Sequence, residues 1–329
     1  MALNSIIIPI YNVELYIIDC INSVLSQSDS IFEILLIDDG SVDGSTILCD
    51  GFLMNNRLIT VIHKSNNGVS NARNVGINLA KGMQILFVDG DDTIKSDYLK
   101  NMRIKGKEDI VLGNCAVLKD DFFKPMMSHG DILQDFGRYW LESGSCSCWG
   151  KSFRTSFLRD NNIFFDTNLS FGEDEKFVID CLKKANYVRR IQYNGYCYNQ
   201  NVPNSAMKNI KWNRLELEEL MCKNIESVIT NKDSKAQIRW LSWHYVINHF
   251  KYFASISIDL NQQKKICLKL KEAYRSPFFR DSIEYVSKNG TIDERIEARL
   301  MGYYRHKLFK PTLLLVQAIS NLKHTLLGG

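Results

Sequence analysis

The sequence lacks the features that mark membrane-spanning, exported and zinc-binding proteins. No uninterrupted apolar run reaches the roughly 18 residues of a membrane-spanning helix, so none is expected. No basic segment precedes the first apolar run, which predicts no export signal. The nine cysteines follow no regular spacing, as expected of reduced thiols in the cytoplasm. Cys146 and Cys148 are one residue apart, with no histidine pair nearby, and are predicted to be buried thiols.

Two nucleotide-binding loops are also missing. No G-x-G-x-x-G turn follows any predicted strand, which argues against a Rossmann dehydrogenase. The loop after the first strand, Tyr11-Asn12-Val13, has no glycine-rich stretch with Arg or Lys, which a nucleotidyltransferase would normally use to bind a triphosphate. Any catalytic or ligand-binding residues must therefore belong to other segments of the chain.

The composition is that of a folded protein, and its charge is unevenly distributed. The 329 residues are 45% hydrophobic and 24% charged, which suits one large domain or two of ordinary size. Residues 206–329 hold 21 Lys/Arg and 12 Asp/Glu, whereas residues 1–205 hold 20 and 25. The basic part is either a solvated surface or a face attracted to an anionic membrane or a phosphate-bearing acceptor.

Short β-branched runs alternate with helical stretches over the first hundred residues. The pattern predicts helices over Val13–Gln27 and Val69–Lys81, and strands over Ser5–Ile10, Glu33–Asp38, Leu58–His63 and Gln84–Asp89. Such near-continuous apolar strands, separated by helices, indicate an α/β fold with a parallel sheet covered on both faces.

The rest of the chain changes character near residue 205. A strand is predicted over Asp109–Leu118, a helix over Phe171–Ala185, and a closing hairpin over Tyr187–Gln192 and Gly195–Asn199. Residues 209–327 are rich in Lys, Glu and Leu with helical periodicity. We therefore predict two domains, residues 1–205 and an all-helical part over residues 206–329.

Polar clusters follow three of the four predicted strands. They are Tyr11-Asn12, Asp38-Asp39-Gly40-Ser41 and Asp89-Gly90-Asp91-Asp92. Ligands bind at the carboxyl ends of the strands in such sheets, so we expect these clusters to meet at one edge. An acid after the second strand could accept a hydrogen bond from a base or a ribose, or it could cap the following helix, which Asp43 could do unaided.

The third cluster places three carboxylates within four residues directly after a buried strand. A divalent cation would relieve their repulsion, because Mg²⁺ and Mn²⁺ are held by one or two carboxylates together with substrate phosphates. The alternative is an Asp-rich turn before the helix expected near Ser96.

Two helix starts and one tryptophan complete the set of candidates. Arg73 lies one turn into a predicted helix and could reach a diphosphate or nearby carboxylates, unless it is a plain surface residue. Glu173 and Asp174 open a later helix, where the dipole favours acids, and one of them could take a proton from an attacking hydroxyl. Trp149 is either a flat platform for a sugar ring or a core residue.

Taken in order, these segments resemble the family 2 glycosyltransferases with the GT-A fold. The resemblance covers residues 4–200 and rests on Pro9-Ile10-Tyr11-Asn12, Ile37-Asp38-Asp39-Gly40-Ser41, Asn67-Gly68, Ala72-Arg73-Asn74-Val75-Gly76, Phe87-Val88-Asp89-Gly90-Asp91-Asp92, Trp149-Gly150-Lys151 and Phe171-Gly172-Glu173-Asp174. It implies a Rossmann-like, mainly parallel sheet with helices on both faces. It also implies inverting transfer of a sugar from a UDP-sugar in a single in-line displacement.

The resemblance further implies roles for individual residues. The nucleotide-sugar site would be formed by Pro9, Tyr11, Asn12, Asp38, Asp39, Asn67, Arg73, Asp89 and Gly90. Asp91 would be the main ligand of Mn²⁺ or Mg²⁺, with Asp92 as a second ligand. Asp174 would be the catalytic base, with Glu173 as the alternative. Trp149 and Lys151 would contact the acceptor.

Bacterial members of this family build capsules, O-antigens and wall polymers. The implied acceptor is a saccharide, including one linked to polyprenyl diphosphate, and no nucleic-acid partner is implied. The apolar stretch Thr312–Leu327 places Leu315, Ile319, Leu322 and Leu326 on one helix face. This stretch could lie on the inner face of the plasma membrane, in which case the protein is cytoplasmic and peripherally bound to the membrane. Alternatively, it could dock on its own domain or on a second copy in a homodimer. The alternative function is a non-catalytic nucleotide-sugar-binding or scaffold protein, which has little use for both acidic clusters.

Overall fold

The chain divides into two compact units, Met1–Asn209 and Ile210–Gly329. The computed structural model describes residues 4–28, 31–113, 126–134, 147–169, 172–202, 239, 276–289 and 295. In the second unit the described residues include helix α12 (Pro277–Asn289), and the all-helical character of residues 206–329 stays a prediction. None of the helices in the described ranges is both long and apolar enough to span a bilayer.

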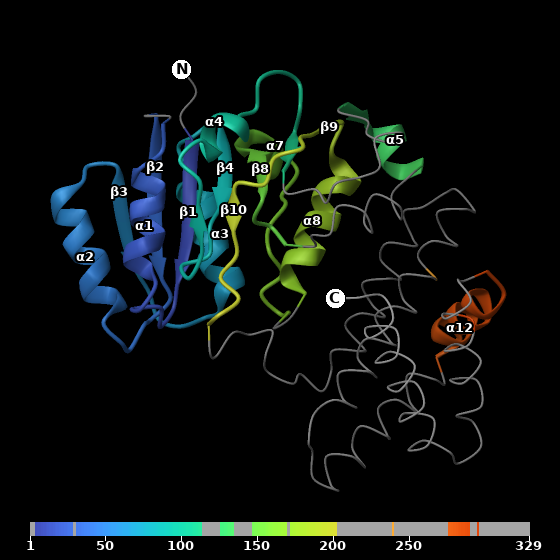
Figure 1. The fold of residues 1–329 in the computed structure, drawn as a ribbon, viewed down its shortest axis with the longest axis horizontal. Helices are drawn as coiled ribbons and strands as arrows, with labels where there is room; N and C mark the ends of the chain where they lie inside the picture. Colours follow the sequence, from blue (N-terminus) through green and yellow to red (C-terminus); the bar gives the residue numbers. More distant parts are fainter. Residues whose placement is uncertain are drawn as a thin grey trace, which may run out of the picture. The chain divides into compact units, whose positions relative to one another are not determined.

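The first unit is built on a mixed sheet (Figure 1). Within the described residues the sheet has eight strands in the order β3-β2-β1-β4-β8-β6-β9-β7. Their bounds are β1 (Asn4–Ile10), β2 (Phe32–Asp38), β3 (Ile59–His63), β4 (Gln84–Phe87), β6 (Ile110–Leu112), β7 (Met126–Ser128), β8 (Lys151–Arg154) and β9 (Tyr187–Arg190). The pairs β1–β2, β2–β3, β1–β4 and β6–β9 are parallel, whereas β8 is antiparallel to both β4 and β6. The family expectation of a mainly parallel sheet is confirmed.

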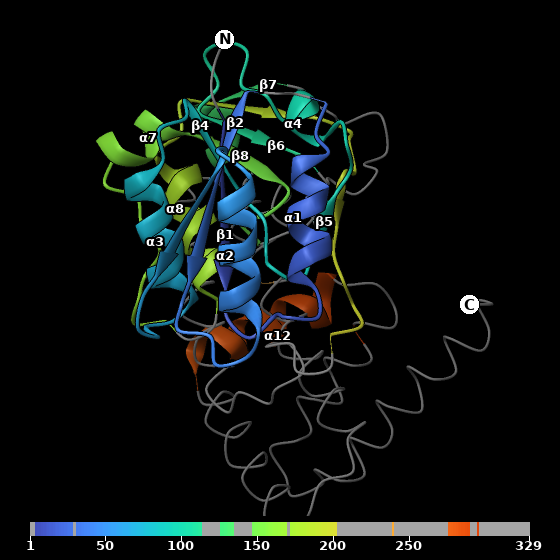
Figure 2. The same ribbon diagram turned by 90° about the vertical axis from the view of Figure 1, so that its left-hand side faces the viewer.

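Helices cover both faces of this sheet. Viewed nearly edge-on, α3, α7 and α8 lie on one side, while α1 and a small ribbon of β5 and β10 lie on the other (Figure 2). The helices are α1 (Ile17–Leu25), α2 (Ser45–Asn55), α3 (Val69–Leu79), α4 (Tyr98–Asn101), α5 (His129–Gln134), α7 (Thr155–Asp160) and α8 (Glu173–Lys184). The ribbon pairs β5 (Thr93–Ile94) antiparallel to β10 (Tyr196–Cys197).

Side-chain alternation along β1 explains how the two faces are filled. Ile6 and Ile8 belong to the same buried cluster as Cys20 and Val24 of α1. Ile7 points to the other face, where α3 approaches so closely that a Cβ on Gly76 would lie 2.4 Å from Cγ2 of Ile7. Because consecutive strand residues face opposite sides, an all-apolar strand is what a doubly covered sheet requires.

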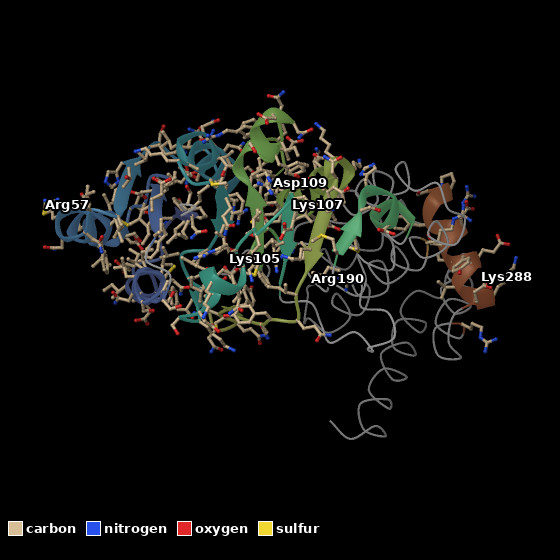
Figure 3. All side chains as sticks on the ribbon, turned by 90° about the horizontal axis from the view of Figure 1, so that it is seen from above. Arg57, Lys105, Lys107, Asp109, Arg190 and Lys288 are labelled. Carbon is tan, nitrogen blue, oxygen red and sulfur yellow. The ribbon has the colours of Figure 1, made fainter. Side chains whose placement is uncertain are left out.

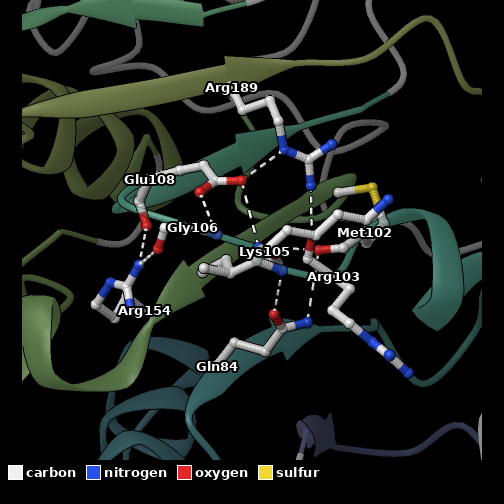
Figure 4. Close-up of polar contacts among 10 residues, drawn as sticks. Gln84, Met102, Arg103, Lys105, Gly106, Glu108, Arg154 and Arg189 are labelled. Atoms are coloured by element: carbon white, nitrogen blue, oxygen red, sulfur yellow. Dashed lines mark hydrogen bonds and ion pairs between the residues drawn. The ribbon is translucent and has the colours of Figure 1, made fainter. Parts of the chain in front are cut away.

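Polar contacts hold the amino-terminal edge of the sheet (Figure 4). Gln84 Oε1 at the start of β4 accepts the Ile104 N–H at 2.6 Å, and Glu108 accepts the Gly106 N–H and the Arg189 Nε–H at 2.7 and 2.8 Å. Arg154 donates to the carbonyl of Gly106 at 2.6 Å. In Figure 3, Lys105 and Lys107 lie far from Arg57 near α2. The opposite edge, where β1, β2 and β4 end, carries the acidic clusters.

The structure corrects two expectations about elements and adds one strand that was not expected. Helix α1 begins at Ile17 rather than Val13, because residues 12–14 are hydrogen-bonded to the loop after β2. The hairpin predicted over residues 187–199 is wrong, since β9 pairs with β6 and β7 while β10 pairs with β5. Strand β8 was not predicted at all. Of the strand predicted over residues 109–118, the structure describes β6, and residues 114–118 lie outside the described ranges.

Candidate active site

The loops after β1 and β2 are locked together by hydrogen bonds. The Asn12 N–H donates to Ser41 Oγ at 3.1 Å, and Asn12 Oδ1 accepts the Val42 N–H at 2.8 Å. Asn12 has φ +53°, a left-handed conformation that Asn tolerates better than most residues. This lock leaves the neighbouring Tyr11 side chain 49% exposed at the sheet edge, where it is free to meet a ligand.

Tight packing brings the acidic loop after β4 against β1. Pro9 lies within β1, and a Cβ on Gly90 would sit 3.2 Å from the Pro9 carbonyl oxygen and 3.1 Å from Cγ2 of Val13. Contacts of that length leave little room for a side chain at residue 90. The glycine therefore lets the acidic loop approach the loop after β1.

Asp38 is a buried acceptor that organises the end of β2. Its carboxylate accepts the Ser41 N–H at 2.9 Å and the Thr46 hydroxyl at 2.8 Å, and it lies 2.9 Å from Nδ1 of His63. Burial alone would raise the pKa of Asp38, but these hydrogen bonds outweigh it and hold the pKa below its ordinary value. The Asp38 side chain thus stabilises the conformation of the loop after β2.

Asp39 joins the ends of β2 and β3. Its Oδ1 accepts a hydrogen bond from the Asn67 N–H at 2.9 Å and pairs with the ammonium group of Lys64. Both contacts use the same carboxylate oxygen, so Oδ2 makes no hydrogen bond to the described residues. Asn67 contributes its backbone here, while its side chain donates to the Ser65 carbonyl.

The three carboxylates after β4 occupy different environments. Asp92 is fully buried, and its two oxygens accept the Tyr196 hydroxyl at 2.6 Å and the Asn199 N–H at 2.8 Å. Burial, opposed by these hydrogen bonds, raises the pKa of Asp92 to about 7. Asp91 is half-buried, and its carboxylate forms no ion pair or side-chain hydrogen bond with any described residue. Burial and the neighbouring Asp89 raise its pKa.

Arg73 brings the two acidic clusters together. It is 3% exposed; Nη2 lies 2.8 Å from Asp89 Oδ1, while Nη1 lies 2.5 Å from Asp174 Oδ1 and 3.3 Å from Glu173 Oε1. Its guanidinium carbon is 5.2 Å from the centre of the Phe165 ring. Burial would lower the pKa of Arg73, but the three carboxylates keep it well above its ordinary value. One positive charge faces three negative ones, so the site holds excess negative charge.

Asp174 is placed at this junction by the start of α8. Gly172 precedes the helix with φ +76°, a conformation that favours glycine, and the acids occupy the first turn. Burial raises the pKa of Asp174 to about 6, against the lowering effect of Arg73 and a backbone hydrogen bond from Cys148. A carboxylate with a pKa near 6 is largely charged at neutral pH and can still accept a proton.

The two residues expected to meet the acceptor both contact other groups, with Trp149 half-buried and Lys151 buried. The Trp149 ring stacks on that of Tyr196, with centroids 4.6 Å apart and planes 10° from parallel. Lys151 is 3% exposed and donates to the Ser147 carbonyl at 2.6 Å, so its ammonium group holds the loop before β8. Sequence reasoning missed Tyr196 and Asn199, because nothing in a two-residue strand signals a partner a hundred residues away.

The described residues contain no group of three His, Cys, Asp or Glu side chains that could hold a metal ion unaided. Mg²⁺ commonly relies on one or two carboxylates together with substrate phosphates. A half-buried carboxylate such as Asp91, surrounded by excess negative charge, fits that mode of binding.

Comparisons with known proteins show which family the chain resembles. The model of the glycosyl transferase family 2 matches residues 5–168. Glycosyltransferase GlyG of Streptococcus pneumoniae is 39% identical over 292 residues, which are 81% of this chain and 94% of GlyG. EpsJ of Bacillus subtilis, described as an uncharacterized glycosyltransferase, is 32% identical over 219 residues, 62% of this chain and 63% of EpsJ.

A solved structure shows the same fold. The crystal structure of Staphylococcus aureus TarS residues 1–349 in complex with UDP-GlcNAc gives a TM-score of 0.65 at 21% identity, covering 98% of this chain and 92% of that one. At this identity the likeness shows the fold alone. The motifs and the relatives point to one family.

Proposed function

Because the chain belongs to glycosyl transferase family 2, we propose that it moves a sugar from a UDP-sugar to a hydroxyl of an acceptor saccharide, with inversion at the anomeric carbon. The contact of Arg73 with both Asp89 and Asp174 carries this proposal. The carboxylates of Asp89, in the acidic loop, and of Asp174, the candidate base, both contact the same guanidinium group.

The donor nucleotide lies across the ends of β1 and β2 in this proposal. The exposed ring of Tyr11 packs against the uracil, and Oδ2 of Asp39 accepts a hydrogen bond from it. Pro9, Asn12 and Gly90 set the spacing of these loops, and the buried Asp38 holds them from below. Asp89 faces the ribose or the sugar, and Asn67 anchors the neighbouring loop through Asp39.

Asp91 is the residue we assign to a divalent cation. Its carboxylate has no hydrogen-bonding side chain among the described residues, and the excess negative charge around Arg73 favours a cation there. Asp92 is less suited, since Tyr196 and Asn199 already occupy both of its oxygens. Mn²⁺ or Mg²⁺ bound at Asp91 would neutralise charge on the leaving diphosphate.

Asp174 is the catalytic base in this mechanism. It takes the proton of the acceptor hydroxyl as the oxygen attacks the anomeric carbon, while the bond from that carbon to the diphosphate oxygen breaks and UDP leaves with the electron pair. Arg73 and the Cys148 N–H fix the carboxylate for this step. Glu173 is farther from Nη1, at 3.3 Å, and is the alternative base.

The acceptor we propose is a saccharide of a wall or capsule polymer, including one carried on polyprenyl diphosphate. A Bacillus spizizenii relative, 32% identical over 193 residues, is a poly(ribitol-phosphate) β-glucosyltransferase, which supports a polymer acceptor, although the acceptor in its name is an acyclic polyol and not a saccharide. The apolar face of residues 312–327 lies outside the described residues, so membrane contact and homodimer formation through it stay predictions.

Thermal unfolding with a panel of nucleotide sugars, each with and without Mn²⁺, tests the donor assignment. Binding to the native state raises the melting temperature by mass action, so a UDP-sugar with Mn²⁺ should give the largest rise. Metal-dependent release of UDP from that donor would then separate an enzyme from a binding protein. Equal shifts with every nucleotide sugar, or binding without turnover, would contradict the proposal.

A further inference from the structure

Three aromatic rings form a stack beside the acidic loop. Trp149 lies parallel to Tyr196 at 4.6 Å and to Tyr198 at 5.9 Å, with planes 10° and 13° from parallel. Tyr196 is 4% exposed, whereas Tyr198 is 43% exposed. The stack therefore has a buried end and an end open to solvent. Its three rings come from two separate segments, the loop before β8 and the segment around β10.

The buried end of the stack is fixed to the acidic loop. The Tyr196 hydroxyl donates to Asp92 Oδ2 at 2.6 Å and accepts the Asp89 N–H at 3.0 Å. On the other side of Tyr198, the Asn199 N–H donates to Asp92 Oδ1 at 2.8 Å. Tyr198 thus lies between two residues that are both tied to the same carboxylate, which holds its backbone in place.

The stack also adjoins the base. The Cys148 N–H bonds to Asp174, and Trp149 is the next residue along the chain. Trp149, the ring on which Tyr198 stacks, therefore directly follows in the chain the residue that bonds to the candidate base. We expect a sugar whose hydroxyl reaches Asp174 to extend toward this stack.

The chemistry of an open aromatic face suits a sugar ring. A pyranose presents hydroxyls at its rim and a patch of C–H groups on its flat face, and that patch packs well against a π-system whose face is electron-rich. Binding sites combine apolar and aromatic surface with a few placed polar groups. Trp149 cannot offer the same free surface, because it lies in contact with two other rings.

We propose that the exposed face of Tyr198 is the platform on which a pyranose ring of the acceptor stacks, with Trp149 and Tyr196 supporting it from behind. This rests on the proposed glycosyl transfer for the identity of the ligand. Tyr198 then acts as a specificity residue: it favours cyclic acceptors over acyclic polyols such as ribitol, which have no flat ring to stack.

Saturation-transfer NMR on the full chain tests the platform without requiring turnover. The probes are methyl β-D-glucopyranoside, methyl β-D-galactopyranoside and methyl N-acetyl-β-D-glucosaminide, with ribitol as the acyclic comparison. The wild-type protein should transfer saturation to the ring C–H protons of at least one glycoside and much less to ribitol. In Tyr198→Ala the apparent affinity for that glycoside should fall by roughly three- to tenfold, the scale of one lost stacking contact.

Two matched variants complete the experiment. Tyr198→Phe keeps the ring and should bind the glycoside like the wild type. Tyr187→Ala should do so too, because it changes a tyrosine at the start of β9, at the opposite edge of the sheet. UDP with Mn²⁺ should still raise the melting temperature of Tyr198→Ala if the donor loops are intact.

Unchanged glycoside binding in Tyr198→Ala would overturn the platform, as would equal transfer to ribitol or no transfer to any glycoside. None of these results depends on transfer activity. If the platform binds a glycoside while UDP-sugars are neither bound nor turned over, the failure lies with the proposed reaction and not with the saccharide site.

Discussion

Arg73 and Asp174 form an ion pair across the active site, with 2.5 Å between Nη1 and Oδ1. The other terminal nitrogen of Arg73 holds Asp89, so this arginine already has its partners before any donor arrives. The sequence resemblance implied a role for Arg73 beside the diphosphate. With three carboxylates on its guanidinium, we instead propose that it positions the base and links it to the acidic loop.

The pH dependence of turnover should depend on Arg73. Asp174 must be deprotonated to act as a base, so kcat/KM of the wild type should fall as the pH drops through about 6. Arg73 lowers the pKa of Asp174, and in Arg73→Gln the acid limb of the profile should move to higher pH by about one unit or more. Arg73→Lys keeps the charge and should shift less, and Arg57→Gln, on the distant surface, should not shift it. Superimposable profiles for Arg73→Gln and the wild type would rule out this role.

Asp174→Asn should fold and bind the donor but lose transfer by about 100-fold or more, because general-base catalysis is worth roughly 10²–10⁴. The amide has nearly the same shape and cannot accept the proton. Turnover under saturating donor, together with the melting temperature, measures both effects. Glu173→Gln is the matched variant and should retain most of the activity; the reverse order of the two defects would assign the base to Glu173.

Asp91→Ala should abolish the part of donor binding that depends on Mn²⁺. The measurement is the rise in melting temperature with UDP, compared with and without the metal, since the metal and the diphosphate bind together at this carboxylate. Asp160→Asn, a substitution at the end of α7, serves as the control and should behave like the wild type. Full metal-dependent binding or turnover in Asp91→Ala would reject the metal assignment.

Tyr196→Phe should lower the free energy of unfolding by roughly 1–3 kcal/mol, because it leaves Asp92 and the Asp89 N–H without their shared partner in a buried site. Urea unfolding followed by fluorescence measures the loss. Tyr187→Phe provides the comparison and should change stability little. A loss in Tyr196→Phe no larger than in Tyr187→Phe would show that the hydroxyl bridge carries no stability.

The first four strands could be predicted because their composition and their environment agree. Ile6, Ile7 and Ile8 are all buried, and only a sheet covered on both faces accepts such a run. The expectation that the polar loops after β1, β2 and β4 meet followed from the same reasoning, since polar loops after parallel strands share an edge. The role of Asp174 came instead from the family resemblance, and Asp174 and Asp89 both contact Arg73.

The partners of the later elements could not be predicted in the same way. Strand β8 has the sequence Lys151-Ser152-Phe153-Arg154. Three of its four residues are polar, so the hydrophobic pattern does not indicate a strand in the middle of the sheet. The Lys151 ammonium donates to the Ser147 carbonyl and the Ser152 hydroxyl donates to the Met102 carbonyl. The local sequence does not predict these contacts. The pairing of β10 with β5 likewise joins residues about a hundred positions apart, for which a short segment carries no signal.

The position of Arg73 depends on Gly76, one turn farther along α3, which lets the helix pack closely against Ile7 of β1. A side chain of even one carbon at residue 76 would have to lift the helix away from the strand. The guanidinium, one turn earlier on the same helix, would then rise out of reach of the carboxylates that share it. The absence of a side chain at residue 76, in the protein interior, thus helps to set the alignment of base and acidic loop.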